Sequence, residues 1–209
     1  MIITTLWRTL RYTFAVRGFH STPSMAFPTR MGCKQSDMFR IHLTEPEEAD
    51  GVTLQDYHAA FLQSPFFQME LFFLSFVGTL TKETTSRDHL LAVALGEKSS
   101  FGPWTTWAVE GSRQKPISAS SDPVSACVLM RCFVAGKPFC DTWWAIEKTA
   151  DCAHAELVFG TAMKLPNSSA PLTKLLVQVL DPFHRLYSRI LLASAKAKLL
   201  EGSVLGKRD

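Results

Sequence analysis

The fold of this chain is decided by residues 170–200, APLTKLLVQVLDPFHRLYSRILLASAKAKLL. Apolar side chains recur in this stretch at spacings of 4, 3, 4, 3 and 4, namely at Leu172, Leu176, Val179, Phe183, Leu186 and Ile190. This period predicts one long helix with a single apolar stripe that faces a partner layer. Pro182 must kink the helix or mark a restart capped by Asp181, because proline lacks the amide proton and crowds the preceding turn.

The partner layer is expected immediately upstream, where the apolar period changes from about 3.6 residues to 2. Loops containing Gly, Ser and Pro divide this region into strands at 104–109, 124–134, 139–149 and 154–163. Short connections make successive strands antiparallel neighbours. The alternation of residues 38–43 predicts one more strand, ahead of the helices.

Helix-start signals lie between this first strand and the other four. Residues 53–56, Thr-Leu-Gln-Asp, resemble a capping box, and Ser64-Pro65 begins a second helix. Ser86 caps a third helix that Gly96 ends. The order is therefore strand, helix pair, antiparallel meander and long closing helix, an α+β arrangement. This order matches the helix-grip architecture of START and Bet v 1-like domains, in which a curved antiparallel sheet wraps a long C-terminal helix around an apolar cavity.

A more specific resemblance lies in residues 180–186, LDPFHRL. They are similar to the Pro-Phe-His-Arg signature that opens the closing helix in a family of uncharacterised helix-grip domains. The similarity extends through residues 87–91 and 95–98 and covers roughly half of the chain. Those relatives carry an acidic Gly-x-Asp-Asp-x-His-Leu-Asp-Phe stretch on a central strand, where this chain has GKPFCDTWW at 136–144. Since the family has no settled activity, the resemblance implies a fold rather than a reaction.

The N-terminus has the composition of a mitochondrial transit peptide. The first acidic residue is Asp37, and the charged residues before it are all basic, at Arg8, Arg11, Arg17, Arg30 and Lys34. On a helix, Ile3, Trp7, Leu10 and Phe14 form the apolar stripe that an import receptor binds. A frayed basic terminus of a cytosolic protein is the alternative.

Domain boundaries and location follow from this interpretation. Residues 1–36 are predicted to be a transit peptide and disordered lead, cut after Phe19 or near Ala26, and residues 37–205 a single helix-grip domain. The predicted location is the mitochondrial matrix or the matrix face of the inner membrane. From Asp37 onward the positive and negative charges nearly balance, so no nucleic-acid partner is expected.

The cysteines and motifs predict neither a metal site nor a cofactor. Five cysteines are an odd number and contain no C-x-x-C pair, so they are expected to be buried structural thiols. No phosphate-binding Gly-rich loop, H-E-x-x-H, G-x-S-x-G or Rossmann fingerprint occurs. The apolar run 66–80 is shorter than the ~20 residues that span a bilayer. It is expected to be a buried helix or, alternatively, an interfacial segment that makes a peripheral membrane contact.

Candidate catalytic residues come from two strands. Phe139, Asp141, Trp143 and Glu147 share one face of the first, and His154 and Glu156 share one face of the next. If these faces line the cavity, His154 with Asp141 or Glu156 forms an acid–base pair over a hydrophobic ligand. The alternative is that these polar residues form the solvated face and Leu157, Phe159 and Met163 pack inward.

Candidate ligand-binding residues are Arg131, Trp143, Phe183 and His184. Arg131 is suited to a carboxylate or phosphate head group, or to a cross-strand ion pair with Asp141. Trp143 belongs to an aromatic-rich sheet, which favours an apolar cavity. His184 caps the cavity mouth or bonds to the sheet.

The function predicted from these features is a mitochondrial helix-grip protein that binds or carries a hydrophobic small molecule, such as a lipid, quinone or polyketide-like compound. One rival is a cofactor-independent cyclase, isomerase or dehydratase of a small-molecule biosynthetic pathway that uses His154. The other is a structural partner of a mitochondrial membrane complex that docks through residues 66–80.

Overall fold

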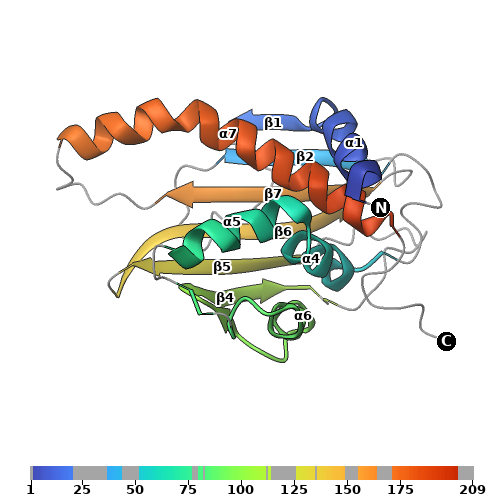
Figure 1. Ribbon diagram of the computed structural model, residues 1–209, viewed down its shortest axis with the longest axis horizontal. Helices are drawn as coiled ribbons and strands as arrows, with labels where there is room; N and C mark the ends of the chain where they lie inside the picture. Colours follow the sequence, from blue (N-terminus) through green and yellow to red (C-terminus); the bar gives the residue numbers. More distant parts are fainter. Residues whose placement is uncertain are drawn as a thin grey trace.

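The computed structural model describes residues 2–20, 37–43, 52–76, 80–81, 83–111, 113, 126–134, 136–148, 155–163 and 171–201. These residues form an α+β fold, in which a curved antiparallel sheet carries helices across one face (Figure 1). We call the face that packs against the helices the inner face and the opposite one the outer face. The predicted α+β class with a closing C-terminal helix is confirmed, and the arrangement is compatible with a helix-grip fold.

The sheet has seven strands in the order β1-β2-β7-β6-β5-β4-β3, and every neighbouring pair is antiparallel. The predicted meander is present. The first predicted strand, β2, pairs with the last strand of the meander, β7. The short β3 was not predicted. The strands are β1 (Arg17–His20), β2 (Asp37–Leu43), β3 (Ser100–Phe101), β4 (Trp104–Glu110), β5 (Ala126–Val134), β6 (Lys137–Lys148) and β7 (Ala155–Met163).

The helices begin and end at the residues that the sequence signals predict. Thr53 and Asp56 form the capping box of α4 (Leu54–Leu62), and α5 (Pro65–Phe76) follows after a short corner. Ser86 caps α6 (Arg87–Leu95), and Gly96 ends it with a φ of 81°, a left-handed conformation that glycine adopts without strain. The longest helix among the described residues is α7 (Pro171–Leu199), as predicted.

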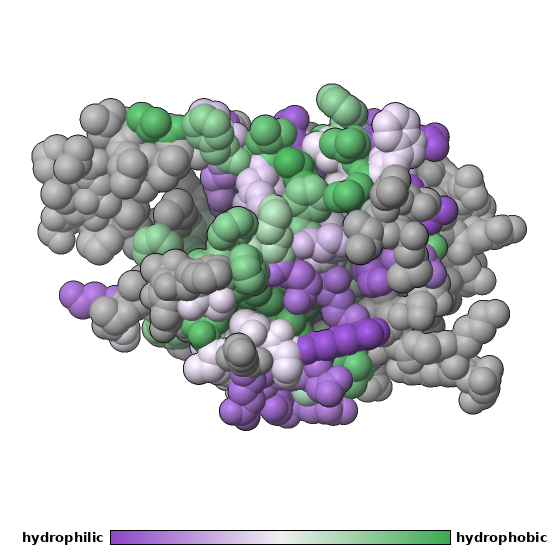
Figure 2. Space-filling view, viewed as in Figure 1, coloured by the Kyte–Doolittle hydropathy of each residue, from purple (hydrophilic) through white to green (hydrophobic). Residues whose placement is uncertain are grey.

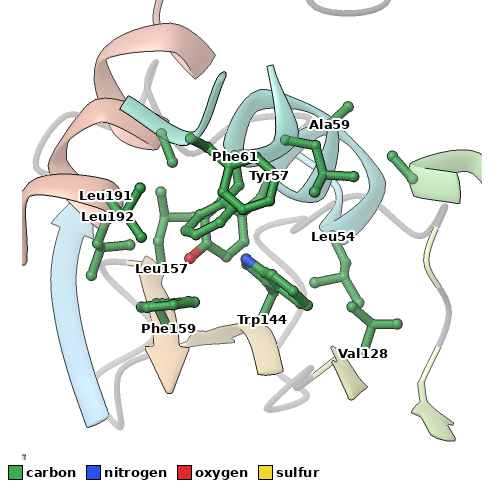
Figure 3. Packing of buried hydrophobic residues seen from close by; sticks show 14 of the residues in the cluster. Leu54, Tyr57, Ala59, Phe61, Val128, Trp144, Leu157, Phe159, Leu191 and Leu192 are labelled. Atoms are coloured by element: carbon green, nitrogen blue, oxygen red, sulfur yellow. The ribbon is translucent and has the colours of Figure 1, made fainter. Parts of the chain in front are cut away.

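The main core lies between the helices and the inner face. Tyr57 and Phe61 of α4 are buried over Trp144 and Phe159 (Figure 3). The Tyr57 hydroxyl donates a hydrogen bond of 3.1 Å to the Val158 carbonyl, so this aromatic contact also fixes the position of α4 over β7. The helices are therefore held to the sheet at one end of the molecule.

The predicted burial of the α7 stripe is wrong for three of its described side chains, and the fourth, Ile190, is half-buried. Val179, Phe183 and Leu186 are 56%, 68% and 53% exposed, whereas Leu191 and Leu192 near the C-terminal end are buried. Figure 1 shows the N-terminal end of α7 extending past the strand ends, and around Phe183 and Leu186 the helix turns other side chains, those of His184 and Ser188, toward the pocket. The helix continues through Pro182 without a break. The side chains of Leu172 and Leu176 lie outside the described residues.

Part of the predicted transit peptide is structured in the described residues. Residues 2–20 form α1 (Ile2–Thr13) and β1, which extends the sheet beyond β2. Thr9 and Val16 are buried, and the Lys196 ammonium of α7 lies 4.6 Å from the centre of the Tyr12 ring. Of the predicted apolar stripe, Trp7, Leu10 and Phe14 are 72%, 55% and 91% exposed, and the Ile3 side chain is not described. Targeting by this segment remains a prediction.

Candidate functional site

A pocket of about 370 Å³ lies between α5, α7 and the inner face of the sheet. This volume falls within the range of roughly 300–1,000 Å³ that small-molecule sites occupy. Its lining residues all come after position 60, so removal of a presequence would leave them in place. A second hollow of about 440 Å³ has walls from α1, including Arg11, Tyr12 and Phe14, and depends on that segment.

Aromatic side chains make up much of the pocket wall. Residues from α4, α5, the sheet and the β3–β4 turn surround an apolar space, including Phe61, Phe67, Phe101, Trp104, Phe139, Trp144 and Phe159. Phe101 and Trp104 stack with ring centroids 5.3 Å apart, and Phe61 packs on Phe159 at 4.8 Å. The predicted apolar cavity between the sheet and the closing helix is therefore present, over the half of α7 that contacts the sheet.

The helices contribute most of the polar groups of the pocket, from residues that we call the helical wall: Glu70, His184, Tyr187 and Ser188. The Tyr187 hydroxyl donates a 2.8 Å hydrogen bond to Glu70 Oε2. Burial raises the pKa of the Glu70 carboxyl, and this hydrogen bond only partly opposes the shift. Burial also raises the pKa of Tyr187, and the nearby Glu70 adds to the effect. The pair can thus hold a proton inside an apolar pocket.

His184 and Ser188 are one helical turn apart and have different surroundings. The His184 Nε2 atom is 2.8 Å from Thr161 Oγ1 of β7, which ties α7 to the sheet. Burial lowers the pKa of His184, while Asp37 and Asp181 oppose this shift and Arg185 adds to it. The Ser188 hydroxyl is buried and has no hydrogen-bond partner within the described structure. A buried polar group without a partner costs free energy, so a ligand group that bonds to it would be stabilised.

Two of the predicted catalytic residues lie on the wrong face of the sheet. Asp141 and Glu156 are on the outer face, because Thr142, Trp144 and Phe159, which alternate with them along the strands, face the pocket. The alternation of side chains along a strand cannot decide which face of the sheet meets α7. The face with Trp144 and Phe159 meets it, and the face with Asp141 and Glu156 does not. Leu157 and Phe159 pack inward, as the alternative predicted. His154 lies outside the described residues, as does the Met163 side chain.

Arg131 forms the cross-strand ion pair that the sequence left as an alternative. Its Nε and Nη2 atoms lie 2.7 and 3.0 Å from the two carboxylate oxygens of Asp141. Asp141 is fully buried, and the Arg131 guanidinium also stacks 4.1 Å from the centre of the Trp107 ring. A guanidinium used in this way on the outer face is not positioned to hold a head group in the pocket.

Glu156 belongs to a second charged cluster on the outer face. The Arg40 Nη1 atom lies 2.6 Å from Glu147 Oε2 and 2.7 Å from Glu156 Oε2, and His42 Nδ1 is 3.2 Å from the other Glu156 oxygen. Burial raises the pKa of Glu147, Arg40 opposes the shift, and Glu156 adds to it. This arrangement joins β2, β6 and β7.

Trp143 and Phe183 are also outside the pocket. Trp143 packs in an outer-face cluster with Leu129 and Val158, and its ring lies over Gly160 so closely that an added Cβ would meet it at 2.1 Å. Phe183 is on an exposed side of α7. Of the predicted site residues that the structure describes, His184 alone lines the pocket.

Glu70 and Tyr187 were missed as site residues. Glu70 is the single carboxylate within the apolar run 66–80, and Tyr187 follows directly on Leu186 of the apolar stripe of the closing helix. A carboxylate within an apolar helix is a usable signal, because burial of that charge requires a partner. Nothing in the sequence placed the two residues side by side.

The described residues contain no group of three or more His, Cys, Asp or Glu side chains able to hold a metal ion, and none of the described helices is both long and apolar enough to span a bilayer. No family model matches the chain, and no match was found among the curated proteins or the solved structures. The pocket is therefore the basis for a functional conclusion.

Proposed function

We propose that this protein binds or carries a largely apolar small molecule with one polar end, in the pocket between α5, α7 and the inner face of the sheet. The observation that carries the proposal is the unpartnered, buried Ser188 hydroxyl in a wall that is otherwise mainly aromatic. Apolar pockets with a few convergent polar groups are typical small-molecule sites. The Tyr187 and Glu70 pair supplies further polar atoms on the same wall.

The exposed apolar surface beside the pocket supports a route for such a ligand. Met69, Phe72 and Phe73 of α5 are 45%, 58% and 60% exposed, and Phe139, which lines the pocket, is 40% exposed. Figure 2 shows apolar residues over α5 and along the described part of α7 on this side. An apolar rim of this kind suits a peripheral contact with a membrane from which the ligand is taken or to which it is delivered. The same rim is the surface that a protein of a membrane complex would contact.

Catalysis is the second candidate function, and the Glu70 and Tyr187 pair favours it. A carboxyl whose pKa is raised by burial, hydrogen-bonded to a phenol, is suited to proton transfer in a cyclase, isomerase or dehydratase without a cofactor. We propose these two residues in place of Asp141 and Glu156. Glu70→Gln and Tyr187→Phe should abolish turnover and retain ligand, since proton transfer contributes typically about 10²–10⁴-fold to rate.

The binding proposal is tested by native mass spectrometry of the purified full chain after incubation with extracted mitochondrial lipids and metabolites. We expect a retained small molecule and a rise in melting temperature that follows its affinity. Ser188→Phe places a ring in the pocket and should abolish retention, whereas Val109→Phe, at an exposed position outside the pocket, should not. No retained mass and no melting shift with lipids, quinones or polycyclic phenols would contradict the binding proposal.

The mitochondrial location is proposed on the basis of the N-terminal composition. A reporter fused to residues 1–26 should enter mitochondria, and changing Arg8, Arg11 and Arg17 to Glu should prevent this by reversing the charge that import requires. A charge-reversed reporter that is still imported would contradict the targeting proposal. An intact Met1 on the mature protein would contradict cleavage.

A further inference from the structure

Two free thiols face each other on the sheet side of the pocket. Cys132 of β5 and Cys140 of β6 are direct partners in the antiparallel register, and both line the pocket. Cys132 is 4% exposed, and Cys140 is half-buried next to the exposed Phe139. The pair therefore lies in the pocket wall, beside the exposed Phe139.

The backbone geometry at this position is compatible with a disulfide. Directly opposed residues of antiparallel strands have Cα atoms about 4.5–5.5 Å apart, and disulfides span about 4.4–6.8 Å. The register shifts immediately after Cys132, between Cys132 and Phe133, which gives the strand local freedom to adjust. Oxidation and reduction would therefore not require the sheet to separate.

The two thiols are also not equivalent. A hydrogen bond from Cys140 lowers the pKa of Cys132. The same hydrogen bond raises the pKa of Cys140, and burial adds to this effect. The hydrogen bond therefore favours a state in which one thiol of the pair is ionised and the other keeps its proton. A dithiol with one thiolate and one thiol is the arrangement found in redox-active pairs.

We propose that Cys132 and Cys140 are a redox-active dithiol in the pocket wall and that their oxidant is a quinone bound in the pocket. In the reaction both S–H bonds break and one S–S bond forms. The two electrons and two protons pass to the two carbonyl oxygens of the quinone, which becomes a hydroquinone. The inference rests on the proposed ligand pocket and names the class of its substrate.

The chemistry of the pocket favours a quinone over a saturated lipid. Its walls are planar aromatic side chains, which suit a flat ring. The hydroxyl of Ser188 is a free donor for a carbonyl oxygen, and the imidazole of His184 lies in the same helical wall. A dithiol supplies the two electrons and two protons that a quinone takes up. A saturated acyl chain would not use the two thiols.

The test uses the reduced full chain carrying Cys33→Ser and Cys152→Ser, mixed with tetramethyl-1,4-benzoquinone, whose four ring methyls block addition of a thiol to the ring. We expect one hydroquinone per chain, a mass loss of two hydrogen atoms, and recovery of both thiols with dithiothreitol. The rate should saturate with quinone concentration, because reaction follows binding. Cys132→Ser or Cys140→Ser should abolish hydroquinone formation. Cys127→Ser, which changes a buried outer-face thiol of the same strand, should leave it unchanged.

The outcomes separate this inference from the binding proposal. If the quinone raises the melting temperature of the Cys132→Ser protein but oxidises neither that protein nor the parent, the dithiol inference is wrong and ligand binding stands. If the quinone neither binds nor reacts, while the hydrophobic ligands used above also fail to bind, both proposals fail. Oxidation of the pair by hydrogen peroxide but not by the quinone would overturn the quinone as substrate.

Discussion

The two faces of the sheet have opposite characters. On the outer face the described charged side chains are engaged with one another, as Arg131 with Asp141 and Arg40 with Glu147 and Glu156. On the inner face the pocket is mainly aromatic and includes one buried hydroxyl, that of Ser188, which has no partner in the described structure. The charged groups named on the outer face are therefore paired with one another. The charge-poor face is the one with both space and an unused hydrogen-bonding group for a ligand.

This difference shows what makes a candidate site. A carboxylate beside an arginine attracts attention in a sequence, but in a fold it often completes an ion pair that joins two strands. A ligand site needs empty volume and groups whose hydrogen bonds are incomplete. The predictions below test whether the outer face is structural and the inner face functional.

The largest effect is expected on the outer face, for Arg131→Met. This change leaves the fully buried Asp141 carboxylate without its bidentate partner, and loss of one member of a buried pair costs about 3–5 kcal/mol. Urea denaturation should show the loss of unfolding free energy, while the folded fraction binds ligand as the parent does. The double variant Arg131→Met with Asp141→Leu should recover much of the stability. Reduced ligand affinity with unchanged stability would instead place Arg131 in the binding site.

A pair of substitutions on α7 tests where the inner face ends. Leu192→Ala should cost about 2–5 kcal/mol, because Leu192 is completely buried against the sheet. Phe183→Ala removes a larger side chain but should change the unfolding free energy by less than about 0.5 kcal/mol, since Phe183 is 68% exposed. Thermal and urea melts of both variants measure this. A cost of several kcal/mol for Phe183→Ala would mean that the Phe183 side chain packs against another part of the protein.

How far the sequence predicts this molecule depends on the kind of signal. Local signals are reliable, as at Thr53, Ser86 and Gly96, because caps act through neighbouring backbone groups. Alternation placed Asp141 and Trp144 on opposite faces correctly but is symmetric, so it could not say which face would meet α7. That choice depends on contacts between segments far apart in the chain.

The prediction of which side of the closing helix is buried fails for the same reason. Its stripe predicts a helix correctly, but the burial of Phe183 depends on which side of the helix meets the sheet. His184 and Ser188 face the pocket and Phe183 is exposed, and no local pattern encodes this choice. The pairing of Glu70 with Tyr187 across 117 positions is likewise a property of the assembled fold.

A pH-dependent effect is expected from His58, a buried residue of α4. Its ring packs on Trp144 with centroids 4.6 Å apart, and burial, with a smaller effect of Arg113, lowers its pKa to about 3. Between pH 6.5 and 3 the unfolded chain takes up a proton on His58 that the folded protein does not. The unfolding free energy should therefore fall by up to about 1.4 kcal/mol per pH unit as the pH decreases through this window.

His58→Phe keeps the ring and removes this titration. The difference in unfolding free energy between the parent and the variant should depend on pH with that slope. The contributions of titrating groups common to both proteins, such as Glu147, cancel in this difference. At pH 7 the variant should be about as stable as the parent, since neither imidazole nitrogen has a partner in the described structure. A difference that does not change with pH would contradict the burial of a neutral imidazole.

The smallest effect on stability, and the most direct test of the inner face, is expected for two serines of α7. Ser188 and Ser194 are both buried, and neither hydroxyl has a partner among the described residues, but only Ser188 lines the pocket. Removing an unpartnered hydroxyl should leave the unfolding free energy unchanged or slightly higher in both alanine variants, because no hydrogen bond is lost. Toward a ligand with a carbonyl or hydroxyl end, Ser188→Ala should weaken affinity by roughly 2- to 10-fold, the value of one hydrogen bond, and Ser194→Ala should not change it. Titration calorimetry measures both affinities, and equal affinities in the two variants would mean that the Ser188 hydroxyl does not meet the ligand.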